Sequence, residues 1–308
     1  MGTSWSLSYV SVDSEPSPAQ VQTAVEAALD RVNLAMSNYR SDSEIALVNR
    51  SAAGEAVTLS PDFVNVLAAS LEIGQASQGA YDVTVGPLVR LWGFGPDPAM
   101  SQQPSPESIS ERAASVGQSA LLLDTSTAVL VKQSQRELDF SSIAKGYAVD
   151  LAGEAIAALG VNDFLLEVGG EMRVSGSSPR GDAWRIAIEQ PDVARRQVAV
   201  AIAVTDASVA TSGDYRNYTV YDGVRYSHSI DPRTGYPVRH DLVSVTVIHE
   251  STMYADAWAT ALIVLGMPAA REVAEQQGLA VYFIQRDGDD YAASHSSAFA
   301  PYLQDEDA

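Results

Sequence analysis

The spacing of apolar residues predicts several helices. After Pro18 and again after Pro61, apolar side chains recur every three or four positions, as in an amphipathic helix with proline in its first turn. A further helix is expected over 147–159. Residues 253–265 (MYADAWATALIVL) are apolar on every side except at Asp256 and Thr260, so we expect a helix that is buried all round.

Short runs of β-branched and aromatic residues predict strands. The first covers 4–12, and the run over 121–131 is typical of a hairpin. Later runs cover residues 164–168, 171–174, 184–189, 198–204, 218–221, 242–247 and 279–285. Helices in the first third and clustered strands afterwards predict an α+β fold with mixed or antiparallel sheets and flanking helices. Because no repeat or linker interrupts the chain, we expect residues 1–303 to form a single catalytic unit, followed by an acidic tail at 304–308.

Two segments have less regular patterns. Residues 37–49 (SNYRSDSEIALVN) carry polar residues before an apolar run, and Ser41 with Glu44 matches a capping box at the start of a helix. Residues 80–95 (AYDVTVGPLVRLWGFG) contain four glycines and prolines, which resist a regular element. We therefore expect a loop there, which either lines a flat aromatic ligand or covers the core.

Composition limits the classes of partner. The formal net charge is −20, which argues against nucleic acid or an anionic membrane surface as the principal partner. Only two of the 19 basic residues are lysines, Lys132 and Lys145, which makes both worth attention. The chain has no cysteine, so disulfides, thiolate metal sites and a cysteine nucleophile are excluded. The longest apolar run, around 257–265, is too short to span a bilayer.

The stretch 226–237 (YSHSIDPRTGYP) concentrates reactive side chains around a turn. It holds one of the four histidines, His228, together with Asp231, and its Pro232 and Gly235 favour a β-turn. Such a turn can direct backbone N–H groups into a concavity that holds an oxyanion or phosphate. The alternative is a hairpin corner in which Asp231 caps the turn and His228 is a half-exposed strand residue.

Asp256 and Thr260 are the polar pair in the apolar helix. Four residues apart, they lie on one face, and a carboxylate with a hydroxyl suits Mg²⁺. A buried carboxylate needs a cation or several donors to offset the loss of hydration. The alternative is that Asp256 sits in the first turn, where the helix dipole favours it, and that Thr260 bonds back to the preceding turn.

Residues 138–150 (LDFSSIAKGYAVD) read as a strand, a loop of small residues and the start of a helix. Unpaired N–H groups and the helix dipole make such a start an anion site, and Lys145 adds a mobile positive charge. The loop is not a Walker A motif. Further along, Gly169 and Gly170 mark a corner where the backbone can come close to another group.

Taken in order, these segments resemble the ApbE family, the FAD:protein FMN transferases. The matching motifs are MGT at the start, SNYRSDSEI, YDVTVGPLVRLWGFG, DFSSIAKGYAVD, EVGGEMR, TSGDY, HSIDPRTGYP, SVTV and ADAWATAL. The chain departs from the family pattern at Phe140, where leucine is usual, at Glu171, where aspartate follows the two glycines, and at Ser229, where an aliphatic residue is usual. An ApbE-like fold is therefore expected.

The resemblance implies Mg²⁺-dependent transfer of FMN from FAD to a threonine or serine hydroxyl of a flavoprotein, with release of AMP. It implies acceptor subunits of the Nqr or Rnf type, and a periplasmic protein whose leader and inner-membrane lipid anchor have been removed. Two alternatives remain open: a Mg²⁺-dependent FAD pyrophosphatase that yields FMN and AMP, and a non-catalytic flavin-binding protein.

The resemblance also implies roles for individual residues. The metal ligands fall on Asp256, Thr260 and the carbonyl of Ala144. The flavin nucleotide pocket falls on Met1, Tyr39, Ala80, Tyr81, Asp82, Ser141, Lys145, Tyr147 and Ile230, and the three tyrosines are candidates for stacking on the adenine or isoalloxazine rings. His228 matches the histidine of the family's HxxDP motif; because its ordinary pKa lies near ~6.5, it is the expected base for the attacking hydroxyl, oriented by Asp231.

Overall fold

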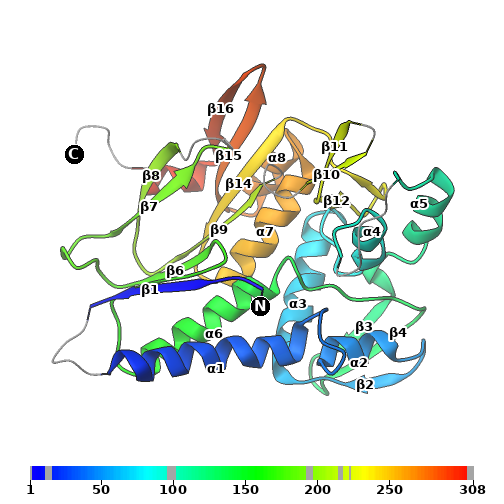
Figure 1. Cartoon of the computed structure of the whole chain (residues 1–308), viewed down its shortest axis with the longest axis horizontal. Coiled ribbons are helices and arrows are strands. Elements are labelled where there is room, and N and C mark those ends of the chain that lie inside the picture. The colour runs from blue at the N-terminus through cyan, green and yellow to red at the C-terminus, as the bar shows by residue number, and fades with distance from the viewer. Residues whose placement is uncertain are drawn as a thin grey trace.

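The centre of the molecule is a seven-stranded antiparallel sheet (Figure 1). The computed structural model describes residues 2–10, 16–95, 102–191, 197–213, 218–221 and 223–303. The strands lie in the order β1 (Trp5–Tyr9), β5 (Phe164–Val168), β6 (Glu171–Ser175), β9 (Ser208–Gly213), β14 (Leu242–His249), β15 (Ala280–Asp287) and β16 (Asp290–His295). The α+β class predicted from the sequence is confirmed.

Helices cover one face of this sheet. In Figure 1, α7 (Thr252–Leu265) runs beside β14 and β9, while α6 (Ala144–Ala158) lies between α7 and α1 (Pro18–Met36). Next to α7 lie α3 (Pro61–Ala76) and α8 (Ala269–Gln276). Every side of α7 meets a neighbour, which explains the apolar sequence that predicted a buried helix.

The opposite face is covered by β7 (Trp184–Glu189), β8 (Val198–Val204) and the 3₁₀ helix η2 (Ser297–Tyr302). Successive side chains of β15 point to opposite faces of the sheet. Val281 and Phe283 pack against the helices, whereas Tyr282 and Ile284 pack on the β7–β8 side. A strand that is buried on both faces carries a continuous apolar run, as the sequence of β15 does.

Smaller elements surround the helical layer. These are α2 (Glu44–Arg50), α4 (Gly86–Leu91), α5 (Pro106–Ala113), the sheet of β2 (Ala56–Thr58), β4 (Val129–Lys132) and β3 (Leu121–Asp124), the 3₁₀ turn η1 (Gln118–Ala120), and the pairs β10 (Tyr218–Tyr221) with β11 (Val224–Ser227) and β12 (Ile230–Asp231) with β13 (Tyr236–Pro237). Within the described ranges, no helix is both long and apolar enough to cross a membrane.

Two local predictions were wrong. The N-cap of α2 is Ser43 and not Ser41, because the Ser43 hydroxyl accepts from the N–H of Ala46. Glu44 instead accepts from the backbone N–H and the hydroxyl of Ser60, at 2.7 and 2.6 Å, and so ties α2 to the start of α3. Part of the expected loop 80–95 is helical, because its proline occupies the first turn of α4, where a missing N–H costs nothing.

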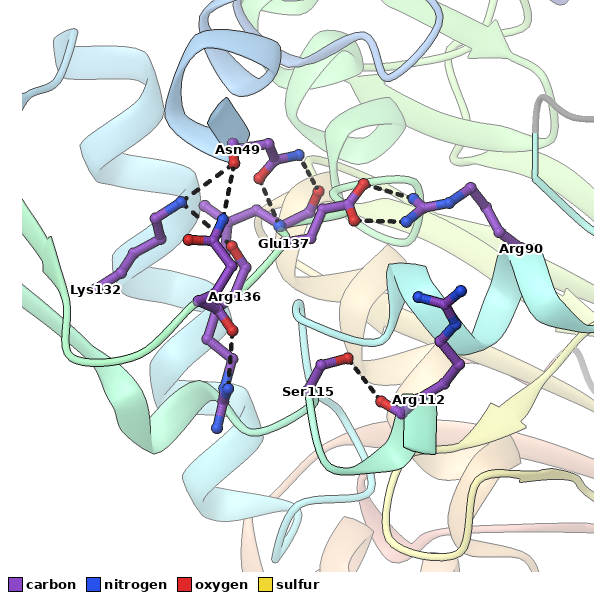
Figure 2. A network of polar contacts seen from close by, with 9 residues as sticks. Asn49, Arg90, Arg112, Ser115, Lys132, Arg136 and Glu137 are labelled. Atoms are coloured by element: carbon purple, nitrogen blue, oxygen red, sulfur yellow. Dashed lines mark hydrogen bonds and ion pairs between the residues drawn. The ribbon is translucent and has the colours of Figure 1, made fainter. Parts of the chain in front are cut away.

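Figure 2 shows a polar network that anchors the chain before residue 138. The Lys132 side chain is 1 % exposed, and its ammonium donates to the carbonyls of Val48, Asn49 and Arg136. Burial lowers the pKa of Lys132, while carbonyls at the end of α2 favour its cation. The Asn49 side chain also pairs with the backbone of Leu138 in both directions. Lys132 is thus a structural residue that fixes where the stretch 138–150 begins.

Candidate active site

The site is built where the start of α6 crosses the start of α7. Gly146 lies in the first turn of α6, and a Cβ atom added there would sit 2.3 Å from the carbonyl oxygen of Thr252 and 2.8 Å from Cα of Met253. Backbone packs directly on backbone, which only glycine allows. The N–H of Gly146 donates to Oδ2 of Asp256 at 3.0 Å. The α6 backbone therefore reaches the predicted metal ligand itself.

Three charged side chains meet at this crossing. Lys145 Nζ lies 2.5 Å from Oε1 of Glu171 and 3.7 Å from Oδ2 of Asp256. Glu171 and Asp256 are both 4 % exposed, whereas the lysine side chain is 35 % exposed. Helix α6 supplies the lysine, the first residue of β6 supplies Glu171, and α7 supplies Asp256. Elements far apart in the sequence thus place two buried carboxylates around one ammonium group.

Burial and charge both act on this cluster. Burial, and after it the nearby charge of Asp256, raises the pKa of Glu171 despite the neighbouring ammonium. Burial disfavours the cation of Lys145, but Asp256 and Glu171 outweigh that cost and raise the pKa of Lys145. Oε2 of Glu171 is buried without any hydrogen-bond partner. One ammonium facing two carboxylates leaves a deficit of positive charge and a free oxygen acceptor.

The residues expected to bind Mg²⁺ fit that ion chemically. A carboxylate from Asp256, a hydroxyl from Thr260 and a backbone carbonyl from Ala144 are hard oxygen donors of the kind that Mg²⁺ prefers. Asp256 lies beyond the first turn of α7, since that helix begins at Thr252, so the alternative of a dipole-stabilised first-turn residue is wrong. Across the described part of the chain, no group of three or more His, Cys, Asp or Glu side chains could hold a metal; the expected set needs only one such side chain.

Thr260 faces a strand that the sequence pattern did not reveal. Its Oγ1 lies 3.3 Å from the hydroxyl of Ser212 on β9. On the same strand, the Thr211 hydroxyl pairs with Thr246 of β14 at 2.8 Å. Ser212 belongs to the TSGDY motif but was not predicted to be a site residue. Its position beside Thr260, which only the structure shows, places it at the candidate site.

The loop before α6 is held by one carboxylate. Oδ1 of Asp139 accepts from the N–H and hydroxyl of Ser141, at 2.8 and 2.5 Å, and from Nδ2 of Asn38 at 2.8 Å. One residue further on, the Ser142 hydroxyl donates to the phenol oxygen of Tyr81 at 3.1 Å. Ser141 is exposed, and its assignment to the flavin pocket stays a prediction.

The three predicted pocket tyrosines have different environments. Tyr39 is 76 % exposed, whereas Tyr81 and Tyr147 are 2 % and 7 % exposed. The Tyr147 hydroxyl donates to Oδ1 of Asp62 at 2.7 Å, and Arg31 holds the same carboxylate. Tyr147 therefore joins α6 to α3 inside the core, and in this arrangement Tyr39 is the tyrosine whose ring is open to a ligand.

Two more predicted pocket residues are built into the fold. The Asp82 carboxylate accepts from the N–H and hydroxyl of Thr84, at 2.7 and 2.6 Å, and from the N–H of Gln118 at 2.9 Å. These bonds attach the segment before α4 to η1, and Ala80 beside it is 1 % exposed. Met1 lies outside the described residues, so its assignment stays a prediction.

The stretch 226–237 forms the expected turn between β12 and β13. The N–H groups of Thr234 and Gly235 donate to the carbonyl of Asp231, and Gly235 has a φ of 80°. The Asp231 carboxylate accepts from the backbone and the guanidinium of Arg233, at 2.9, 2.8 and 2.9 Å. Asp231 thus caps its own turn, as in the second of the two readings of the sequence, and its role in orienting a histidine stays a prediction.

His228 lies just before that turn. It is half-buried, with its ring edge-on to Phe94 at 6.2 Å between centroids. The neighbouring Ile230 is 5 % exposed and packs in an apolar cluster with Leu88 and Trp92. Strand β12 begins two residues after His228 and packs against α7. The histidine segment therefore lies next to the helix that carries Asp256 and Thr260.

Comparisons with known proteins agree with this architecture. A model of the ApbE family matches residues 1–283. The FAD:protein FMN transferase of Haemophilus influenzae is 41% identical over 305 residues, covering 97% of this chain and 88% of that protein. The flavin transferase ApbE from Vibrio cholerae superposes with a TM-score of 0.91 at 38% identity, covering 98% of this chain and 96% of the other. The apo flavinyl transferase ApbE of Pseudomonas stutzeri gives 0.90 at 40% identity, covering 98% and 94%.

Proposed function

This chain belongs to the ApbE family, and from that membership and the geometry of the site we propose that it is an FAD:protein FMN transferase. The reaction joins an acceptor hydroxyl to the phosphorus of the FMN half of FAD. The bond between that phosphorus and the bridging oxygen breaks, and AMP leaves with the bridging oxygen. The proton of the attacking hydroxyl passes to a base on the enzyme.

The observation that carries this proposal is the cluster of Lys145, Glu171 and Asp256 at the start of α6. In the first turn of this helix, the N–H groups of Ala144 and Gly146 already donate to the carbonyl of Phe140 and to Asp256, so it is the positive end of the helix dipole that favours a phosphate oxygen here. Lys145 adds a charge that is a third exposed. Phosphoryl transfer depends mainly on placing such groups beforehand and on neutralising charge at the anhydride.

We propose that Asp256, Thr260 and the carbonyl of Ala144 hold Mg²⁺. When bound, this ion neutralises charge on the diphosphate and orients it. The residues of the chain do the rest: Gly146 N–H fixes one oxygen of Asp256 at 3.0 Å, Glu171 holds Lys145 in place, and His228 receives the proton of the acceptor hydroxyl.

We also propose, from the family resemblance, that the acceptors are flavoprotein subunits of the Nqr or Rnf type and that the protein works in the periplasm, attached through a lipid anchor in its precursor. The test is to co-express the chain, carrying an export leader, with such a subunit and to look for covalent flavin on it. A subunit that stays unflavinylated while the enzyme is active on a peptide would remove this acceptor class.

One experiment tests the activity. The protein is incubated with FAD and Mg²⁺, with and without a threonine-bearing acceptor peptide, while AMP, FMN and covalently bound flavin are followed. Covalent flavin that requires the acceptor supports transfer. AMP and FMN formed without the acceptor would instead indicate an FAD pyrophosphatase, and FAD binding without any AMP would indicate a flavin-binding protein. Asp256→Asn serves as the matched control, because it keeps the shape of the side chain but loses its charge.

A further inference from the structure

A carboxylate from α6 reaches the first turn of α7. Oδ1 of Asp150 accepts from the N–H of Thr252 at 2.8 Å, and Oδ2 accepts from the hydroxyl of Ser251 at 2.7 Å and from the N–H of Met253 at 3.0 Å. The first N–H groups of a helix have no hydrogen-bond acceptor within that helix. Here Asp150 of α6 provides the acceptor for the first N–H groups of α7. Asp150 is 9 % exposed, so water contributes little to these contacts.

Helix α7 also has a cap of its own. The hydroxyl of Ser251 accepts from the N–H of Tyr254 at 3.4 Å, as an N-cap residue does. Because this cap and the apolar surroundings of α7 are present in any case, the Asp150 carboxylate is not needed merely to begin the helix. What it adds is a fixed position of α7 relative to α6.

A second contact with α7 comes from Gly146, on the same side of α6. Gly146 lies four residues before Asp150, hence one turn away on the same face. It packs on the backbone of Thr252 and donates its N–H to Asp256. One attachment is at the beginning of α7 and the other is at its metal-binding carboxylate. Two attachments one turn apart oppose both sliding and rotation of α7.

Arg173 of β6 also contacts Asp150. Its Nη1 donates to the carbonyl of Asp150 at 3.0 Å and lies 3.7 Å from Oδ1. Its side chain runs over Gly153, where an added Cβ would lie 2.7 Å from Cδ of the arginine. Arg173 thus places a positive charge beside the carboxylate, and the positive end of the α7 dipole faces it, so the contact is charge-assisted.

We propose that Asp150 is a positioning residue for the transfer reaction. Through the start of α7 it sets the distance between the oxygens of Asp256 and Thr260, on α7, and the carbonyl of Ala144, on α6, and thereby the affinity for the divalent cation. This inference depends on the proposed function, because it concerns the same cation site. The Asp150 carboxylate bonds to Ser251, Thr252 and Met253, so we assign it an effect that acts through the position of α7.

The test compares Asp150→Ala and Asp150→Asn with the wild-type protein. The first readout is the Mg²⁺ concentration that gives half-maximal release of AMP from FAD. The second is the Mg²⁺ concentration at the midpoint of the rise in melting temperature in the presence of ADP, which does not depend on turnover. Ser105→Ala is the control, because it removes a helix cap remote from this crossing, the one on α5.

We expect Asp150→Ala to raise both Mg²⁺ midpoints by about 10-fold or more, the effect typical of removing a group that orients metal ligands. Part of the lost rate should return at saturating Mg²⁺. Asp150→Asn should lie between, because its one amide oxygen can still accept from one of the two N–H groups but carries no charge. Ser105→Ala should leave both midpoints unchanged.

A lower melting temperature of Asp150→Ala with wild-type Mg²⁺ midpoints would overturn the proposal, because Asp150 would then only stabilise the fold. If the alanine variant does not fold, the asparagine variant decides by the same criterion. A wild-type protein that cleaves no FAD refutes the proposed function, whereas the melting midpoints still decide the role of Asp150. No response of the wild-type melting temperature to Mg²⁺ would overturn the positioning role as well.

Discussion

Gly146→Ala tests the backbone contact on which the site is built. In an unobstructed helix this change stabilises a protein by about 1 kcal/mol. Here the new methyl group would lie 2.3 Å from the carbonyl oxygen of Thr252 and 2.8 Å from Cα of Met253. Since optimal separations are about 3.5–4.0 Å, α6 and α7 must move apart by roughly 1 Å at this point.

The displacement has two measurable costs. Inserting a methyl group into a packed interior destabilises by about 1–3 kcal/mol, so the sign of the usual glycine-to-alanine effect is reversed. The 3.0 Å bond from Gly146 N–H to Asp256 stretches beyond hydrogen-bonding distance, which moves the carboxylate away from its position. A shift of about 1 Å in such a site costs on the order of 100-fold in rate.

The assay pairs thermal unfolding with flavin transfer at saturating Mg²⁺. Gly74→Ala in α3 is the matched control, because the three atoms nearest to a methyl group there belong to the side chain of Gln118 and not to backbone. That side chain can move at the cost of its bond to the carbonyl of Leu71. We expect the control to keep its transfer rate, and Gly146→Ala to be slower than the wild type and to melt at a lower temperature. A Gly146→Ala protein as stable and as active as the wild type would refute the argument that direct backbone contact positions Asp256.

Four further tests address single groups. Asp256→Ala should abolish Mg²⁺-dependent release of AMP, and unchanged release would remove it from the cation site. His228→Ala should slow transfer by about 100-fold or more while FAD affinity is largely kept; weakened binding with a normal rate at saturation would make it a pocket residue. Tyr147→Phe should cost about 1 kcal/mol in urea unfolding through the lost bond to Asp62 and leave the KM for FAD unchanged; a raised KM would instead place the phenol in the pocket. Burial lowers the pKa of His249 below 6.5, so the unfolded chain takes up its proton first. The stability that depends on the neutral ring is fully present above pH 6.5 and is lost as the pH falls below that value. The urea midpoint of His249→Phe should therefore fall less on acidification than that of the wild type, and an equal fall in both proteins would contradict this reasoning.

The sequence predicted elements whose signals are local. The helices after Pro18 and Pro61 begin as expected, with Ser17 and Ser60 as their caps, because a proline, a preceding serine and a helical period all lie within a few residues. Strand β9 was missed although it is central to the sheet. Half of its residues are small hydroxyl side chains, which are satisfied by Thr246 and Thr252 far away in the sequence. No pattern within β9 itself could show those partners.

The candidate site divides in the same way. Asp256 and Thr260 stand out because they are the polar residues of an otherwise apolar helix. That they lie close to each other follows from the helical period alone. The contact between Lys145 and Glu171 depends on how β6 meets α6, and the grip of Asp150 on α7 joins helices about 100 residues apart. Such contacts exist only after folding, so the resemblance could identify the lysine but not its partner.

Charge explains why this site needs more than its lysine. The whole chain carries a formal net charge of −20, so a diphosphate gains nothing from long-range attraction. Lys145 is already engaged by Glu171 at 2.5 Å and lies 3.7 Å from Asp256, and a charge that is shared in this way is only partly available to a third anion. We therefore propose that the remaining neutralisation comes from a cation held by Asp256 and Thr260. On this proposal, the fixed separation of α6 and α7 matters as much as the Asp256 side chain, because both are needed to hold the cation beside the dinucleotide.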